Sequence, residues 1–145
     1  MTSTRSNAGS PHFAGSTPKM GRRKAPPVVT FRAADPLQDY YEIDGECFSV
    51  AKLIDDTKDL TPFELPLAGI NLSDVIWDHS TVYTLAFHIK KVNAANLDYP
   101  IILDWNGEIA DGRHRIIKAL AEDRTTISAV RMQWKPKPDR VEKAD

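Results

Sequence analysis

Five consecutive residues, Asp111 to Arg115, carry the side chains of this chain best suited to chemistry. They read Asp-Gly-Arg-His-Arg, and the largely apolar residues 116–121 that follow are typical of a helix. The first backbone N–H groups of a helix have no partner within it, and the helix dipole adds about half a positive charge at the same place. Phosphate is an anion that proteins bind in this way. The pattern therefore predicts a phosphate-binding site.

Each residue of this segment has a functional role in that prediction and a plain structural alternative. Gly112 lets the backbone approach a ligand, or only forms a turn. Arg113 and Arg115 can hold phosphate oxygens. His114 can donate to phosphate or act as an acid or base, or else attach the helix to the preceding hairpin. Successive helical positions point about 100° apart, so these side chains should not all share one direction. Lys118, one turn later, can reach the same anion or stay solvated.

Two carboxylates are candidates for catalysis. Asp111 lies at or just before the helix start, where it can help to bind Mg²⁺ together with substrate phosphates or act as a general base. A carboxylate at that position also stabilises the helix without any other role. Asp74 is the second candidate for the metal or base role, and an ordinary surface acid is its alternative.

The elements that must position these residues follow from local signals. Residues 100–105 and 108–110 form a hairpin around Asn106-Gly107, because both positions tolerate positive φ. A helix follows from Gly112 to about Ala121, and residues 126–133 form a last strand. The hairpin and the helix together place the anion site at a junction between strand and helix.

Earlier residues complete an α+β pattern. Residues 40–43 and 47–48 predict two strands around the turn Asp44-Gly45, and Ser49 caps a helix over residues 50–56. Residues 63–67 predict an edge strand, since Pro66 cannot donate to a central ladder. A second helix is expected over residues 81–93, with Ser80 as its N-cap. Its apolar stripe should face the core; it consists of Leu85, Ile89 and Val92, with Val82 and Ala86 beside it.

Composition limits the classes to which the chain can belong. Its 145 residues, 41% of them hydrophobic, suit one domain with a modest core. Cys47 is the single cysteine, which excludes an internal disulfide framework and suits a reducing compartment. No apolar run is long enough to span a membrane, and no secretory signal is recognisable at the start. We expect a cytoplasmic protein.

Charge divides the chain unevenly. The net charge is −1, but residues 1–34 hold six basic residues and no acidic one, so the remainder carries −7. We expect residues 1–34 to be a disordered basic arm, residues 35–135 a domain and residues 136–145 a flexible tail. Arg22, Arg23 and Lys24 can contact nucleic acid or an acidic partner, or merely aid solubility.

Residues 65–67, 99–103, Gly107 and above all residues 111–120 together resemble the ParB/sulfiredoxin-like superfamily. Its hallmark is an apolar strand, a hairpin glycine and a Gly-x-[His/Arg]-Arg segment that begins a helix. The resemblance spans about residues 40–134 and implies an α+β fold with a small mixed sheet and about three helices. It also implies phosphate contacts for His114 and Arg115, and in a kinase branch of the family an acidic residue near the position of Asp74.

The superfamily includes CTP-hydrolysing partition proteins, sulfiredoxins, a serine kinase branch and nucleases. Arg113 stands where sulfiredoxins carry a reactive cysteine, so sulfinic acid reduction is not expected. The chain stops soon after the last strand, so the helix-turn-helix DNA reader of partition proteins is not expected either. The resemblance implies binding of a nucleoside triphosphate, ATP or CTP, with Mg²⁺, and possible hydrolysis or transfer of phosphate.

Two alternatives stay open beside the nucleotide hypothesis. One is a non-catalytic module that binds DNA or protein through the basic arm, and the other is a ParB-like nuclease, for which no two-metal carboxylate cluster is evident in the sequence. A dimer is possible in each case. By analogy, a compact domain of this kind suits a phage or plasmid accessory protein.

Overall fold

The computed structural model describes residues 25–31, 39–74, 76–77 and 80–142. The chain divides into two units, residues 1–31 and 32–145. In the first unit, residues 25–31 have no helix or strand, and the side chains of Val28 and Val29 are exposed. The predicted nucleic-acid contacts Arg22, Arg23 and Lys24, like residues 1–24 as a whole, lie outside the described residues.

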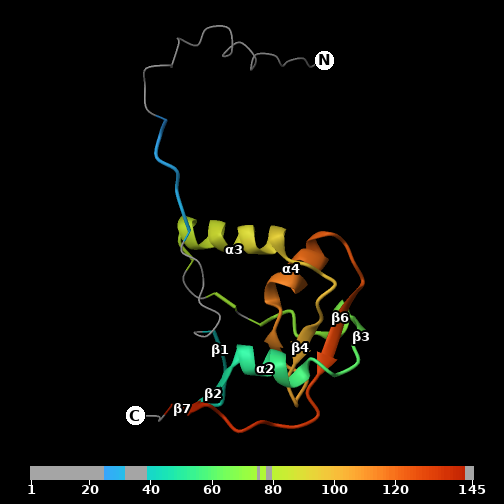
Figure 1. The fold of residues 1–145 in the computed structure, drawn as a ribbon. Coiled ribbons are helices and arrows are strands. Elements are labelled where there is room, and N and C mark those ends of the chain that lie inside the picture. Colours follow the sequence, from blue (N-terminus) through green and yellow to red (C-terminus); the bar gives the residue numbers. More distant parts are fainter. Residues whose placement is uncertain (1–24, 32–38, 75, 78–79, 143–145) are drawn as a thin grey trace. The chain divides into compact units, whose positions relative to one another are not determined.

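The second unit has a mixed α+β fold, as the sequence predicts. Its described residues form three α-helices, one 3₁₀ turn and two small sheets (Figure 1). In chain order the elements are β1 (Tyr40–Ile43), β2 (Glu46–Ser49), α2 (Val50–Thr57), β3 (Phe63–Pro66), η3 (Leu67–Gly69), α3 (Val82–Ala94), β4 (Ile101–Leu103), β5 (Ile109–Asp111), α4 (Arg113–Ala121), β6 (Thr126–Arg131) and β7 (Arg140–Val141). None of the described helices combines the length and the apolar character that crossing a membrane requires.

The larger sheet has the strand order β3-β6-β4-β5 and is mixed. Strand β6 runs parallel to β4 and antiparallel to β3, and β4 pairs antiparallel with β5 as the Asn106-Gly107 hairpin predicts. The parallel pair requires a crossover connection. Helix α4 makes that crossover, so the fold places its first turn directly after β5.

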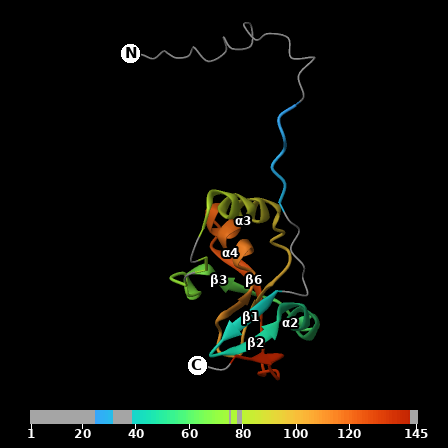
Figure 2. The same cartoon turned by 90° about the vertical axis from the view of Figure 1, so that its left-hand side faces the viewer.

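Both faces of the larger sheet are covered. Ile101 and Leu103 of β4 pack in a cluster with Ile116 of α4, whereas Ile102 between them packs in a second cluster with Phe48 of β2 and Leu53 of α2. Figure 2 shows α4 and the β1–β2–α2 layer on opposite sides of this sheet. A strand with two covered faces has no solvent side, which explains why its residues are apolar without alternation.

The smaller sheet has the order β1-β2-β7. Its last strand, β7, lies within the segment that the sequence predicts to be a tail. Residues 136–145 were expected to be flexible, yet Arg140–Val141 pairs with β2 as strand β7. Asp139 anchors this segment: its carboxylate accepts a hydrogen bond from the backbone N–H of Ser49 at 2.8 Å and forms an ion pair with Lys52. A strand of two residues has no recognisable periodicity, so only these long-range contacts define it.

Helix starts follow the capping rules, with one correction. The Ser49 side chain accepts from the N–H of Lys52 and caps α2 as predicted. Helix α3 is capped by Thr81 and not by Ser80. Thr81 and Thr84 form a reciprocal capping box, in which each side chain bonds to the backbone of the other. The two side chains together satisfy two backbone donors, the N–H groups of Thr84 and Thr81, whereas Ser80 lies one residue too early to take part.

The apolar stripe predicted for α3 does not face the core. Val82, Leu85 and Ile89 are 91%, 44% and 51% exposed, and α3 has no fully buried side chain. Its half-buried positions instead follow a helical period along Thr84, Phe87, His88, Lys91 and Val92, so Val92 is the one residue of the predicted stripe that is half-buried. Helix α3 packs mainly on α4. Because α3 packs mainly on α4, His88 faces α4 and most of the apolar stripe is exposed among the described residues.

Candidate functional site: a cationic pocket at the start of helix α4

Gly112 forms a left-handed turn that the fold itself requires. Its φ is +112°, and a Cβ atom at this position would lie 2.5 Å from Cγ2 and 2.8 Å from Cβ of the buried Ile101. No L side chain fits both the dihedral angle and the space. The structural alternative therefore accounts for the glycine without any ligand.

Helix α4 begins without a side-chain cap, because Gly112 occupies the N-cap position. Helices α2 and α3, in contrast, carry Ser49 and Thr81 there. The free N–H groups of the first turn of α4 adjoin an open pocket of about 970 Å³. The pocket is lined by residues from β1, α2, α3, β5, α4 and the loops between them, and all of Asp111, Gly112, Arg113, His114 and Arg115 are among them. The predicted anion site is thus a concave surface with oriented donors.

Arg115 is held by Asp111. Its Nη2 lies 3.1 Å from Oδ2 of Asp111, and both side chains are about one-fifth exposed. The Nε atom of Arg115 is buried and has no hydrogen-bond partner among the residues that the structure describes. Leaving a charged donor without an acceptor is costly. The guanidinium therefore has unused capacity for an oxyanion beside the α4 turn.

Arg113 is held by Asp74, the second predicted carboxylate. Its Nη2 lies 2.9 Å from Asp74 Oδ2 and 3.3 Å from the carbonyl oxygen of Ile109. Asp74 does not line the pocket itself. The geometry suits Asp74 to orienting Arg113 more than to acting as a base on a ligand.

His114 turns toward α3, where it meets His88. His114 Nε2 and His88 Nδ1 are 3.0 Å apart, and the Trp77 ring stacks on His88 at a centroid distance of 3.9 Å. Burial, followed by the charge of Lys91, lowers the pKa of His114 to about 4. At neutral pH His114 is therefore an uncharged imidazole, which suits hydrogen bonding or proton acceptance and not a fixed positive charge. The three consecutive side chains thus diverge toward three partners, as helical spacing predicts, while all lining one pocket.

Asp39 and Lys91 are pocket residues that the sequence did not reveal as candidates. Burial at the pocket and the neighbouring charge of Asp111 raise the pKa of Asp39. Asp39 precedes β1 and Asp111 ends β5, and the two strands are far apart in the sequence. No local signal could have joined these two carboxylates.

Lys118, which was predicted to reach the anion, has a different role. Its Nζ donates to the carbonyl oxygens of Asn93 and Ala95 at 3.1 and 2.7 Å, and it does not line the pocket. These carbonyls lie at the end of α3, where a cation stabilises the helix dipole. Lys118 thus joins α4 to α3 and is removed from the set of candidate ligands.

A second polar feature missed in the sequence is the fully buried Asp104. Its carboxylate accepts from the Tyr41 hydroxyl at 2.8 Å and from the backbone N–H groups of Asn106 and Glu108 at 2.7 and 2.9 Å. Burial, followed by the Asp104 carboxylate, raises the pKa of Tyr41. Asp104 therefore fixes the β4–β5 turn and ties it to β1.

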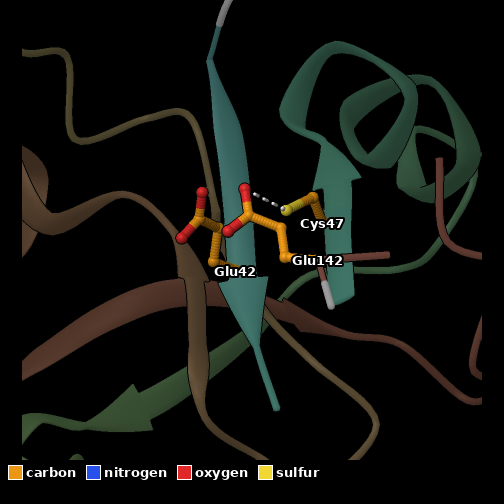
Figure 3. Close-up of side chains that lie close together, drawn as sticks. All are labelled: Glu42, Cys47 and Glu142. Carbon is orange, nitrogen blue, oxygen red and sulfur yellow. Dashed lines mark hydrogen bonds between the residues drawn. The ribbon is translucent and has the colours of Figure 1, made fainter. Parts of the chain in front are cut away.

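Another group of possible metal ligands lies on the smaller sheet. Glu42, Cys47 and Glu142 converge there (Figure 3), and their ligand atoms all lie within 4.8 Å of one another. The Arg140 guanidinium already lies 3.6 Å from Cys47 Sγ and 3.3 Å and 3.9 Å from the carboxylates of Glu142 and Glu42. The chain thus supplies its own cation, and we interpret the group as the ion pairs that hold β7 on β2. Cys47 does not line the pocket at α4.

The structure thus brings Asp111, Gly112, Arg113, His114 and Arg115 together, with Asp74 behind Arg113, and excludes Lys118. Comparisons with protein-family models, with curated proteins and with solved structures found no match to this chain. The pocket alone therefore has to support an interpretation of function.

Proposed function

We propose that the domain is ParB/sulfiredoxin-like and binds the phosphates of a nucleoside triphosphate, ATP or CTP, in the pocket at the start of α4. The observation that carries this proposal is the uncapped α4 N-terminus beside Arg115, whose buried Nε has no described partner. Phosphate oxygens would satisfy both the free N–H groups and this guanidinium. The pocket of about 970 Å³ has room for a nucleotide.

The side chains have separate tasks in this proposal. Arg115 and Arg113 contact phosphate, and their partners Asp111 and Asp74 orient them. The neutral His114 donates a hydrogen bond to a phosphate oxygen or accepts a proton from an attacking group. Hydrolysis or transfer of phosphate depends mainly on such positioning and charge neutralisation, so the site needs no covalent nucleophile.

The carboxylates of the pocket are suited to Mg²⁺. Asp39 and Asp111 face one pocket and are close enough for Asp111 to raise the pKa of Asp39. Oxygen ligands of this type, one or two in number, are what Mg²⁺ takes from proteins when phosphates complete its shell. Asp111 and Asp39 would hold the ion, and its charge would neutralise the phosphates.

Calorimetric titration of ATP, CTP, GTP and UTP with Mg²⁺ tests the proposal. Arg115→Ala should weaken binding by about 1.5–3 kcal/mol, roughly 10- to 100-fold in Kd, because a charge-assisted contact is lost. Arg124→Ala is the matched control: it removes the same charge from an exposed pair with Glu122 beyond the end of α4. Equal affinities in the two variants would exclude the α4 pocket as the phosphate site.

The interaction-module alternative rests on the charge asymmetry between the basic residues 1–34 and the acidic remainder. Binding of DNA through Arg22, Arg23 and Lys24 would weaken steeply with salt, and deletion of residues 1–30 would abolish it. A gel-shift titration of the full chain and of the deletion variant distinguishes this function from nucleotide binding.

Two-metal nuclease activity would need carboxylates for a second metal ion in the pocket. Asp39 and Asp111 are the only described carboxylates there besides Glu42. For each of these functions we propose a cytoplasmic accessory protein, with a dimer as one assembly.

A further inference from the structure

The pocket contains a pair of histidines, His88 and His114, of which only His114 has a role in the proposed phosphate binding. His88 comes from α3 and His114 from α4, and both line the pocket. Their facing nitrogens are 3.0 Å apart, and their rings lie 5.2 Å apart at an interplanar angle of 23°. Trp77 stacks on His88 at an interplanar angle of 13° and so holds the ring in place. Two imidazoles fixed in this way form one hydrogen-bonded unit.

The hydrogen bond decides how many protons the pair can hold. When both rings are neutral, only one of the two facing nitrogens carries a hydrogen. One outer nitrogen of the pair, His88 Nε2 or His114 Nδ1, is then bare and able to accept a proton. A second added proton would turn both facing nitrogens into donors 3.0 Å apart, which breaks the contact. The pair is therefore built to take up one proton.

The charges around the pair keep it neutral while the pocket holds no anion. Lys91 of α3 opposes protonation of both histidines, and Arg115 of α4 opposes it at His114. Asp111 of β5 favours protonation of His114, but its carboxylate is engaged by Arg115. Burial acts in the same direction as the cations and is the largest cause that lowers both pKa values.

We infer that binding of an oxyanion of the phosphate class at the α4 N-terminus is coupled to the uptake of one proton by the His88–His114 pair. The proton comes from solvent and stays on the pair. An anion bound near Arg115 offsets the positive charges that disfavour the imidazolium, since these charges act at short range in a partly buried site. The inference rests on the proposed phosphate pocket and adds its regulation by pH.

The direction of the pH dependence follows from linkage. The anion raises the pKa of the pair above its value in the free protein, so the bound state holds more protons. Affinity should therefore increase as the pH falls through the pKa of the bound state and level off below that of the free state. Each unit by which the anion raises the pKa corresponds to a tenfold gain in affinity.

Sulfate is a suitable probe, because it mimics phosphate and remains a dianion between pH 4 and 8. Imidazole resonances of His88 and His114 would be followed by NMR across this range, with and without saturating sulfate. We expect sulfate to raise the pKa of the pair by about one unit, so its affinity should increase as the pH falls from 7 to 4, toward a limit of about tenfold. His88→Asn keeps a hydrogen-bonding group near the Nδ1 position but cannot titrate, so it should bind sulfate with a weaker pH dependence.

The possible failures are distinguishable. If sulfate shifts the backbone amides of Gly112 and Arg115 but leaves the histidine pKa values unchanged, the proton coupling is wrong and the phosphate pocket stands. If sulfate shifts neither the amides nor the histidines, the phosphate pocket is wrong and the coupling with it. The coupling would also be wrong if the affinity of His88→Asn for sulfate kept the pH dependence of wild type. The coupling requires His88 to share in the titration, whereas a merely structural role does not.

Discussion

Replacement of Gly112 by alanine should destabilise the domain more than any other single-methyl addition at its described glycines. The added Cβ would lie 2.5 Å from Cγ2 of Ile101, whose side chain is fully buried. Overpacking of this kind costs about 1–3 kcal/mol, and a non-glycine residue in a left-handed conformation costs about 1–2 kcal/mol more. We therefore expect the free energy of unfolding to fall by about 2–5 kcal/mol in total.

Gly107→Ala is the matched control for this experiment. Its φ is also positive, at +86°, but the nearest atoms to an added Cβ are those at the flexible end of the Arg131 side chain, 3.6 Å away. It should lose only the dihedral term of about 1–2 kcal/mol. The entropy effect of alanine on the unfolded chain is similar in both variants and cancels. Urea denaturation measures both, and a Gly112→Ala protein as stable as Gly107→Ala would refute the steric argument.

Three further predictions concern stability. Asp104→Ala should lower the free energy of unfolding by about 2–4 kcal/mol in urea denaturation, because it leaves the buried Tyr41 hydroxyl and turn N–H groups without an acceptor; the same stability as wild type would contradict this role. Asp139→Ala should lose about 1 kcal/mol through the N–H of Ser49 and increase hydrogen exchange in β7, and unchanged exchange there would show that Asp139 does not anchor the strand. The pKa of His114 is lowered from the usual 6.5 to about 4, so its contribution to stability should be complete above pH 6.5 and decline as the pH falls to 4; thermal melts of wild type and His114→Asn across this range should converge toward low pH, and parallel curves would exclude the effect.

Local signals predicted most elements of the fold. The Asn106-Gly107 turn, the Ser49 cap and the apolar strand at Ile101–Leu103 each depend on residues close together in sequence, and all three are confirmed. Strand β1 begins and ends where predicted, at Tyr40 and Ile43. Such features can be predicted because turns, caps and strand propensity involve only neighbouring residues.

Helix α3 shows where periodicity misleads. Its sequence contains a regular apolar stripe, and the usual inference that such a stripe faces the core is wrong here. The orientation of a helix depends on the surfaces against which it can pack, and α3 packs mainly on α4. The same orientation placed His88 against His114 in the pocket.

The sequence by itself determined the Asp111–Arg115 segment and its position between a strand and a helix. It left open whether Gly112 serves a ligand or only a turn, and the contact with Ile101 that requires glycine there belongs to the tertiary structure. Only the tertiary structure decided the partners of those residues: Asp74 for Arg113, His88 for His114, and Asp39 beside Asp111. The physical reason is distance along the chain. A turn or a cap is formed by residues a few positions apart, whereas these contacts join residues 26 or more positions apart and exist only once β6 has paired with β4 and α4 has packed on the sheet.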